Sequence, residues 1–171
     1  MGQRTCIIVQ KHETTEQGTK ITTKAFHEQW GLGRITPREM MTIILSTAGH
    51  SAANDDFLDV TMPGTATDGT GFFEKERLNS LDFSNPAAIG EIMQELGNNN
   101  GGIFVRFTTD RFDVERIEYA YMLGSEEDGD YKSFCSEDEW MGKFRYVDER
   151  FKELYRHTLD YFGAKEWRNE Q

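Results

Sequence analysis

The apolar residues in the middle of the chain change period, and the change marks a helix followed by two strands. The positions at helical spacing are Ile89, Ile92, Met93 and Leu96. Asn85 can cap this helix, Pro86 suits its first position, and Gly97 suits the residue just past its end. The β-branched and aromatic runs at 103–108 and 114–123 predict two strands. Because a helix stripe and a sheet face each need a partner, we expect the helix to lie over this strand pair.

The N-terminal part predicts a hairpin and a second helix. Residues 4–10 and 20–26 read as strands, joined by a polar loop at 14–19 that is longer than the two-residue minimum. Thr36 and Glu39 have the spacing of a capping box, so we expect the helix to begin there. Its predicted buried face and end are Met40, Ile43, Ile44, Ala48 and Gly49.

The rest of the chain predicts a long loop, a short strand and two further helices. Residues 50–70 are polar and rich in glycine and threonine, which is typical of a loop with room for one short edge element. Residues 131–135 read as a short strand. Ser136 and Glu139 form a second capping box before a one-turn helix, and residues 148–162 have the spacing of an amphipathic helix.

These elements predict one α+β domain over residues 1–171. We expect an antiparallel sheet of four or five strands, with about three helices packed mainly on one of its faces. The length is sufficient for a core without disulfides or metals. Cys6 and Cys135 each lie in or beside an apolar run and lack Cys-x-x-Cys spacing, so we expect two buried thiols.

The charge narrows the classes of partner. The chain has 30 acidic and 19 basic residues, a formal net charge of −11. This charge disfavours nucleic acid or an anionic membrane as the direct partner. The start of the chain lacks the apolar region of a signal peptide, and no apolar run approaches the ~20 residues of a membrane span, so the sequence predicts a cytoplasmic protein.

The common catalytic motifs are incomplete. In His27-Glu28-Gln29-Trp30 the position for a second metal-binding histidine holds Gly31, so we expect Trp30 to pack on the sheet and His27 to lie at a strand end. The glycine-rich segment 64–71 lacks the lysine of a phosphate-binding loop. Histidines at 50 and 157 have no Gly-x-Ser-x-Gly partner. The sequence therefore favours a protein that is not an enzyme.

Two acidic segments are the candidate binding surface. The predicted partner-binding residues are Asp55, Asp56, Asp59, Glu126, Glu127, Asp128 and Asp130. Neither segment has the spacing of an EF-hand loop, and we expect no cofactor and no bound metal. The alternative is a metal-dependent hydrolase or nuclease that uses the carboxylates of the first segment together with Asp68.

A resemblance adds an expectation about origin. The start Met1-Gly2-x-Arg4, an apolar strand and hairpin, and then Phe26-His27-Glu28-Gln29-Trp30-Gly31 are similar to a group of uncharacterised small proteins of bacteriophages and mobile elements. The group carries an aromatic-His-Trp-x-Gly string there, and residues 89–107 are similar as well. The resemblance implies an accessory protein in the host cytoplasm, and it transfers no site residue.

Charge and resemblance together predict the function class. We expect a non-enzymatic protein, a monomer or dimer, that binds a host protein through its acidic segments. A basic nucleic-acid-binding factor such as a CRISPR nuclease or a repressor is the expected partner, because clustered carboxylates can imitate the charge of phosphates.

Overall fold

The structure is a computed structural model. It describes residues 4–31, 34–49, 66–97, 100–110, 113–124, 131–144 and 147–167. Six strands form one sheet in the order β3-β2-β1-β4-β5-β6. The strands are β1 (Thr5–Thr15), β2 (Gly18–Glu28), β3 (Ala66–Asp68), β4 (Gly102–Thr109), β5 (Val114–Met122) and β6 (Ala164–Glu166).

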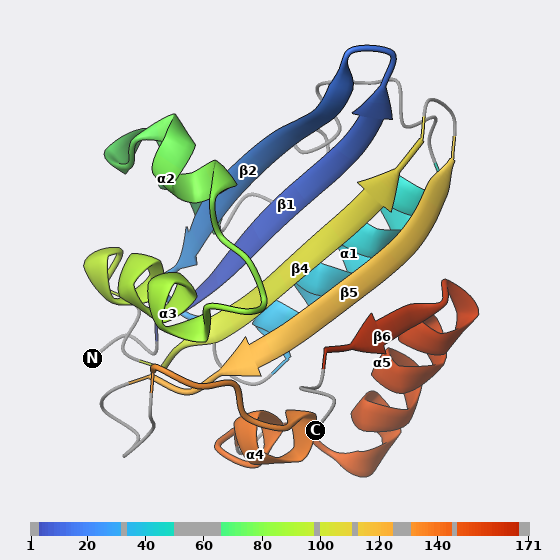
Figure 1. Ribbon diagram of the computed structural model, residues 1–171. Coiled ribbons are helices and arrows are strands. Elements are labelled where there is room, and N and C mark those ends of the chain that lie inside the picture. The colour runs from blue at the N-terminus through green and yellow to red at the C-terminus, as the bar shows by residue number, and fades with distance from the viewer. Residues whose placement is uncertain are drawn as a thin grey trace.

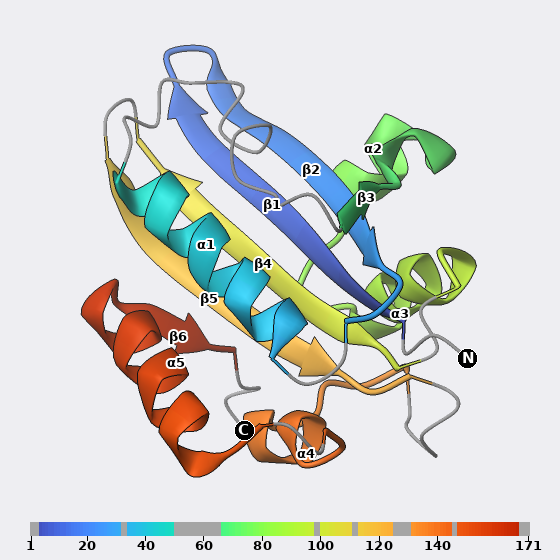
Figure 2. The same cartoon turned by 180° about the vertical axis from the view of Figure 1, so that it is seen from behind.

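Within the described residues, five α-helices and one short 3₁₀ helix accompany the sheet. They are α1 (Ile35–Gly49), η1 (Thr70–Phe72), α2 (Lys75–Asn79), α3 (Pro86–Glu95), α4 (Glu137–Met141) and α5 (Glu149–Tyr161). Helices α2 and α3 lie on one face of the sheet (Figure 1). On the other face α1 lies along β4 and β5, with α5 beside β6 (Figure 2). We call these the α2/α3 face and the α1/α5 face.

The α+β class is confirmed, but the finer prediction of an antiparallel sheet of four or five strands with about three helices mainly on one face is wrong. The described residues form six strands and five α-helices. The sheet is mixed, because β1 runs parallel to β4 and β5 runs parallel to β6. Helices cover both faces of the sheet instead of mainly one. The two hairpins β1–β2 and β4–β5 are each antiparallel and local. They meet where β1 pairs with β4, and the paired residues, such as Cys6 and Gly102, are 96 positions apart, so no local pattern specifies this contact.

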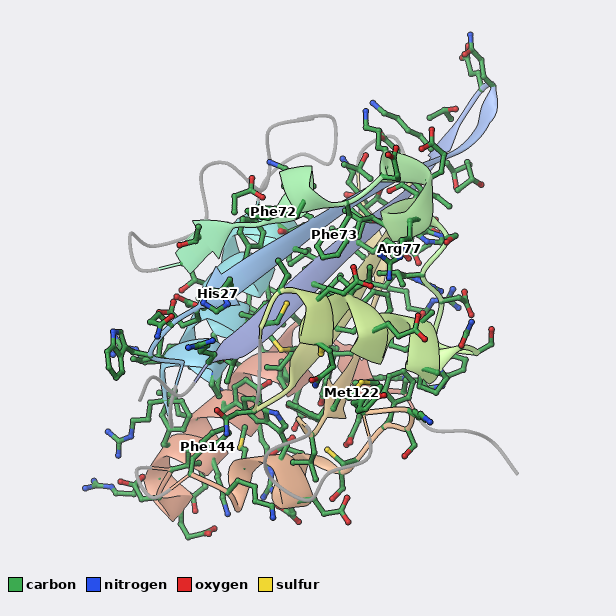
Figure 3. The ribbon with its side chains drawn as sticks, turned by 90° about the vertical axis from the view of Figure 1, so that its left-hand side faces the viewer. His27, Phe72, Phe73, Arg77, Met122 and Phe144 are labelled. Carbon is green, nitrogen blue, oxygen red and sulfur yellow. The ribbon has the colours of Figure 1, made fainter. Side chains whose placement is uncertain are left out.

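Each face of the sheet has its own core. The α1/α5 face buries odd-numbered β1 residues such as Ile7 and Val9 with Tyr121, Trp140 and Tyr155. The α2/α3 face buries a separate set that includes Ile8, Phe104, Met122 and the apolar stripe of α3. Figure 3 shows Met122 beneath α3 and Phe144 on the opposite side of the sheet. Strands buried on both faces explain why the central runs read as almost continuously apolar.

The central unit is confirmed. Asn85 accepts a hydrogen bond from the Ala88 N–H, Pro86 occupies the first turn, and Gly97 has a φ of +74°. Ile89, Ile92 and Met93 are buried against Phe104, Ala120 and Met122, as the spacing predicts. Gly90 is required as well, because a Cβ there would lie 1.8 Å from the carbonyl oxygen of Tyr131.

The N-terminal predictions need two corrections. The hairpin loop is the two-residue minimum, because Thr15 pairs with Gly18, whose φ of +116° suits glycine. The predicted capping box at Thr36 is wrong: α1 already includes Ile35, and the Thr36 hydroxyl donates to the carbonyl oxygen of Gly31 at 2.9 Å. The buried Thr36 hydroxyl thus fastens the helix start to the loop before it.

Some of the smaller predictions are confirmed and others are wrong. The short edge element within 50–70 is confirmed as β3, and the Ser136–Glu139 capping box is present at α4. The strand predicted at 131–135 is reduced to one bridge between Cys135 and Tyr121. Trp30 is not packed on the sheet, since 58% of it is exposed. Both cysteines are free thiols, as predicted, but only Cys6 is fully buried, whereas Cys135 is partly buried.

The amphipathic helix near the C-terminus is confirmed as α5. Phe151, Tyr155 and Leu159 are buried, whereas Leu154 and Tyr161 of the same helix are exposed. Within the described residues, no helix has both the length and the apolar character that a membrane crossing requires.

Candidate functional site

The predicted partner-binding residues lie outside the described part of the chain. This holds for Asp55, Asp56, Asp59, Glu126, Glu127, Asp128 and Asp130. Their assignment therefore stays a prediction. The described part of the chain contains other acidic residues, and their positions show whether carboxylates gather on one surface.

Of the residues named for the alternative metal site, the structure describes Asp68. Asp68 ends the edge strand β3, and its Oδ1 atom accepts a hydrogen bond from the Thr70 N–H at 2.9 Å, so it caps a turn. Among the described residues, no three histidine, cysteine or acidic side chains are placed to hold a metal ion. His27 lies near the end of β2, as expected, and His157 is exposed on α5.

Carboxylates do gather where α4, α5 and β6 meet, at the lower right of Figure 1. A hollow of about 320 Å³ lies there, which we call the acidic groove. It is lined by Ser136, Glu137, Asp138, Arg156, Asp160 and Glu166. Four carboxylates and one guanidinium thus face the same space, and the local charge is strongly negative.

The capping box of α4 explains how the groove acquires two of its acids. Ser136 caps the helix by accepting from the Glu139 N–H, which fixes Glu137 and Asp138 in the first turn. Acidic side chains in a first turn are favoured by the helix dipole. The sequence therefore places these carboxylates for a local reason, and tertiary structure brings α5 and β6 against them.

Arg156 binds two of the carboxylates that line the acidic groove. Its Nε donates to Glu137 Oε1 at 2.9 Å and its Nη2 to Asp138 Oδ1 at 2.8 Å. Burial raises the pKa of Glu137 above its ordinary value; Arg156 opposes this rise, while Glu166 adds to it. One guanidinium bound between two carboxylates shows which chemistry the groove accommodates: a planar cation with several N–H donors.

A second hollow, of about 450 Å³, adjoins the acidic groove and shares Ser136 and Glu166 with it. Its other walls include Pro86, Phe134 and Trp167, and Trp167 stacks on Phe83 with ring centroids 4.9 Å apart. The surface thus combines a carboxylate-rich half with an aromatic half. Aromatic side chains beside a polar groove are typical of protein-binding surfaces.

The thiol in this second hollow does not behave as a nucleophile. Cys135 is partly buried, and burial raises its pKa to about 12, with Glu139 adding to the rise. A reactive cysteine needs the opposite, a thiolate stabilised near neutral pH by positive neighbours. The arrangement at α4, α5 and β6 is therefore suited to binding cations and unsuited to thiol catalysis.

Sequence reasoning identified the capping box but missed the groove. Glu137, Asp138, Asp160 and Glu166 come from three segments whose contact is decided by tertiary packing. The only signal in the sequence is the density of acids between 137 and 166. No protein-family model, no curated protein and no solved structure matches this chain. The resemblance to proteins of phages and mobile elements stays a prediction.

Proposed function

We propose that this protein acts by binding and not by catalysis, and that its partner is a host protein with a basic surface. In this proposal it is an accessory protein of a phage or mobile element. The acidic groove is the observation that carries the proposal, because four carboxylates line it and only one arginine among its lining residues offsets their charge.

Three features support this function. The net charge of −11 steers a basic partner toward the chain over long range. The adjoining aromatic hollow supplies apolar contact area beside the charges, which a stable interface needs. The acidic segment predicted from the sequence directly precedes Tyr131 and the residues that line this hollow. A partner whose basic site normally binds nucleic acid would then be blocked by competition.

The test is a pull-down from bacterial lysate with the tagged protein at low and high salt. We expect recovery of a basic protein that is released as salt rises, since ions screen charge pairs that lie at a surface. A triple variant of the groove, Asp138→Asn with Asp160→Asn and Glu166→Gln, should lose this protein. A matched variant, Glu74→Gln with Glu91→Gln and Glu115→Gln, changes the net charge equally at exposed positions elsewhere and should retain it.

Thermal unfolding of both triple variants shows whether they fold. If no protein is recovered at low salt, or if the groove variant and the matched variant retain the same protein equally, the proposal is wrong.

A further inference from the structure

The uncovered half of the α2/α3 face carries polar side chains in register. Along β1 the residues on this face are Cys6, Ile8, Gln10, His12 and Thr14, so the face changes from apolar to polar at Gln10. Helices α2 and α3 and the link between them lie over the apolar half, and beyond that link no described helix covers the sheet (Figure 1). His12 is in register with Ile21 of β2 and Thr108 of β4, and Thr108 with Arg116 of β5.

The orientation of the Gln10 side-chain amide is determined by its own hydrogen bonds, and it decides which hydrogen bonds the neighbouring side chains can make. It is fully buried, and its Nε2 donates to the carbonyl oxygens of Leu81 at 3.0 Å and Leu78 at 3.4 Å. Carbonyl oxygens only accept, so this end of the side chain is the amide nitrogen. The Oε1 end is therefore the acceptor, and it receives the Arg106 Nε at 3.1 Å.

The same oxygen selects one tautomer of His12. His12 Nε2 lies 2.7 Å from Gln10 Oε1, and two acceptors cannot share a hydrogen bond, so Nε2 carries the proton. In the neutral ring Nδ1 is then an acceptor, and within the described residues it makes no hydrogen bond. Partial burial lowers the pKa of His12, and the guanidiniums of Arg106 and Arg116 lower it further, while Asp82 opposes them.

Charged side chains approach His12 from three of the elements around it. Arg106 comes from β4, Arg116 and Glu118 from β5, and Asp82 from the link between α2 and α3; β2 contributes the uncharged Ile21 and Thr23. Asp82 pairs with Arg106 at 2.9 Å, and Glu118 takes the Arg116 Nε at 3.0 Å. At the imidazole the two guanidiniums outweigh Asp82. Two arginines and two carboxylates thus balance around His12, in a chain whose net charge is −11.

We propose that His12, Thr108 and Arg116 form a binding site for a phosphate group, either inorganic phosphate or the phosphoryl group of a monoester. They stand on three neighbouring strands about 4.8 Å apart. The Arg116 Nη groups and the Thr108 hydroxyl donate to phosphoryl oxygens. His12 Nδ1 accepts the proton of the monoanion, whose second ionisation lies near pH 6. The bound state thus holds one proton between ring and ligand. This site is separate from the acidic groove.

The proton requirement separates phosphate from sulfate. Sulfate has no proton to donate at neutral pH, so it binds only when the ring itself is protonated. A fraction of the phosphate is still the monoanion at pH 7, and this form brings its own proton to the neutral ring. We therefore expect inorganic phosphate to bind more tightly than sulfate at pH 7, and the difference to shrink as the pH falls below the pKa of His12.

The test is an NMR titration of the histidine rings of the full chain with inorganic phosphate. We expect the His12 signals to move and its apparent pKa to rise, while His157 on α5 is unchanged. Arg116→Gln and Thr108→Val should each weaken binding, Arg116→Gln by about tenfold for one lost charged hydrogen-bond donor. Arg150→Gln, an exposed arginine of α5, is the matched control and should leave the affinity unchanged.

Further arms identify the source of the phosphoryl group. O-phosphoserine and AMP are titrated in parallel: tighter binding of one of them than of inorganic phosphate assigns the ligand to phosphorylated side chains or to nucleotides. Equal affinity assigns inorganic phosphate itself. If none of the three moves the His12 signals, or if Arg116→Gln and Arg150→Gln bind phosphate equally, the proposal is wrong. The groove triple variant should bind phosphate normally, so either proposal can fail alone.

Discussion

The two faces of the sheet differ in how far their apolar layer extends. On the α1/α5 face the layer is continuous from Phe26 on β2 to Ala164 on β6, and two of its phenols pair with each other. Tyr121 and Tyr155 share a hydrogen bond of 2.7 Å, and Tyr155 also contacts the sulfur of Met40 at 3.1 Å. Burial raises the pKa of both phenols far above the ordinary value, so neither ionises in the folded protein.

On the α2/α3 face the apolar layer stops halfway along the strands. The last apolar row contains Ile8 and Phe104, and the next contains Gln10 and Arg106. Arg106 stacks on the Phe83 ring at 4.9 Å while it pairs with Asp82, so one side chain belongs to both halves. One face of a strand can therefore be apolar and buried at one end and carry polar side chains at the other.

The largest effect on stability is expected from a cavity in the apolar layer of the α1/α5 face. Trp140 is fully buried, stacks on Tyr121 at 5.5 Å and meets Phe144 edge-on at 4.7 Å. Trp140→Ala should lower the free energy of unfolding by about 3–5 kcal/mol, because a large cavity cannot collapse in a packed layer. Urea denaturation measures it. A loss below about 1 kcal/mol would mean that this layer is loosely packed.

A smaller effect is expected at the border of the other face. Gln10→Leu keeps the volume but leaves the carbonyl group of Leu81 without its side-chain donor and Arg106 without one acceptor, while the carbonyl group of Leu78 keeps the backbone N–H of Leu81. We expect a loss of about 1–3 kcal/mol by urea denaturation. The His12 ring should also lose its tautomer preference, which nitrogen chemical shifts of the imidazole report. An unchanged tautomer ratio would contradict the role assigned to Gln10.

A third and smaller effect is expected at Asp82, and it depends on pH. The pKa of Asp82 is about 2 against an ordinary 3.8, first because its carboxylate accepts from the Ser84 N–H and then because of Arg106. A lowered pKa stabilises the fold above the ordinary value, and this contribution is lost as the pH falls toward 2. Asp82 is partly exposed, so we expect less than about 1 kcal/mol.

The measurement is the unfolding free energy of the parent and Asp82→Asn from pH 7 to pH 2. The difference between them should be constant above pH 5 and should close below pH 4. A difference that grows on acidification would contradict the assigned sign.

The candidate sites were only partly predictable, and the reason is physical. The alternation on β1 does show Gln10 and His12 breaking an apolar series, so the polar half of the α2/α3 face left a signal in the sequence. Which residues of β4 and β5 join them depends on the parallel pairing of β1 with β4. The acidic groove has no comparable signal in the sequence, because its acidic residues come from three segments and none of these segments shows a periodic pattern.

By itself the sequence determined the local elements: the helix from Pro86 to its end near Gly97, both hairpins, the α4 cap and the amphipathic α5. Each depends on residues within a few positions of one another, where capping, turn geometry and periodicity act. Only the tertiary structure decided the mixed strand order, the covering of both faces and the meeting of α4, α5 and β6. Those contacts join segments far apart in the chain, and burial of apolar surface selects among them without leaving a local pattern.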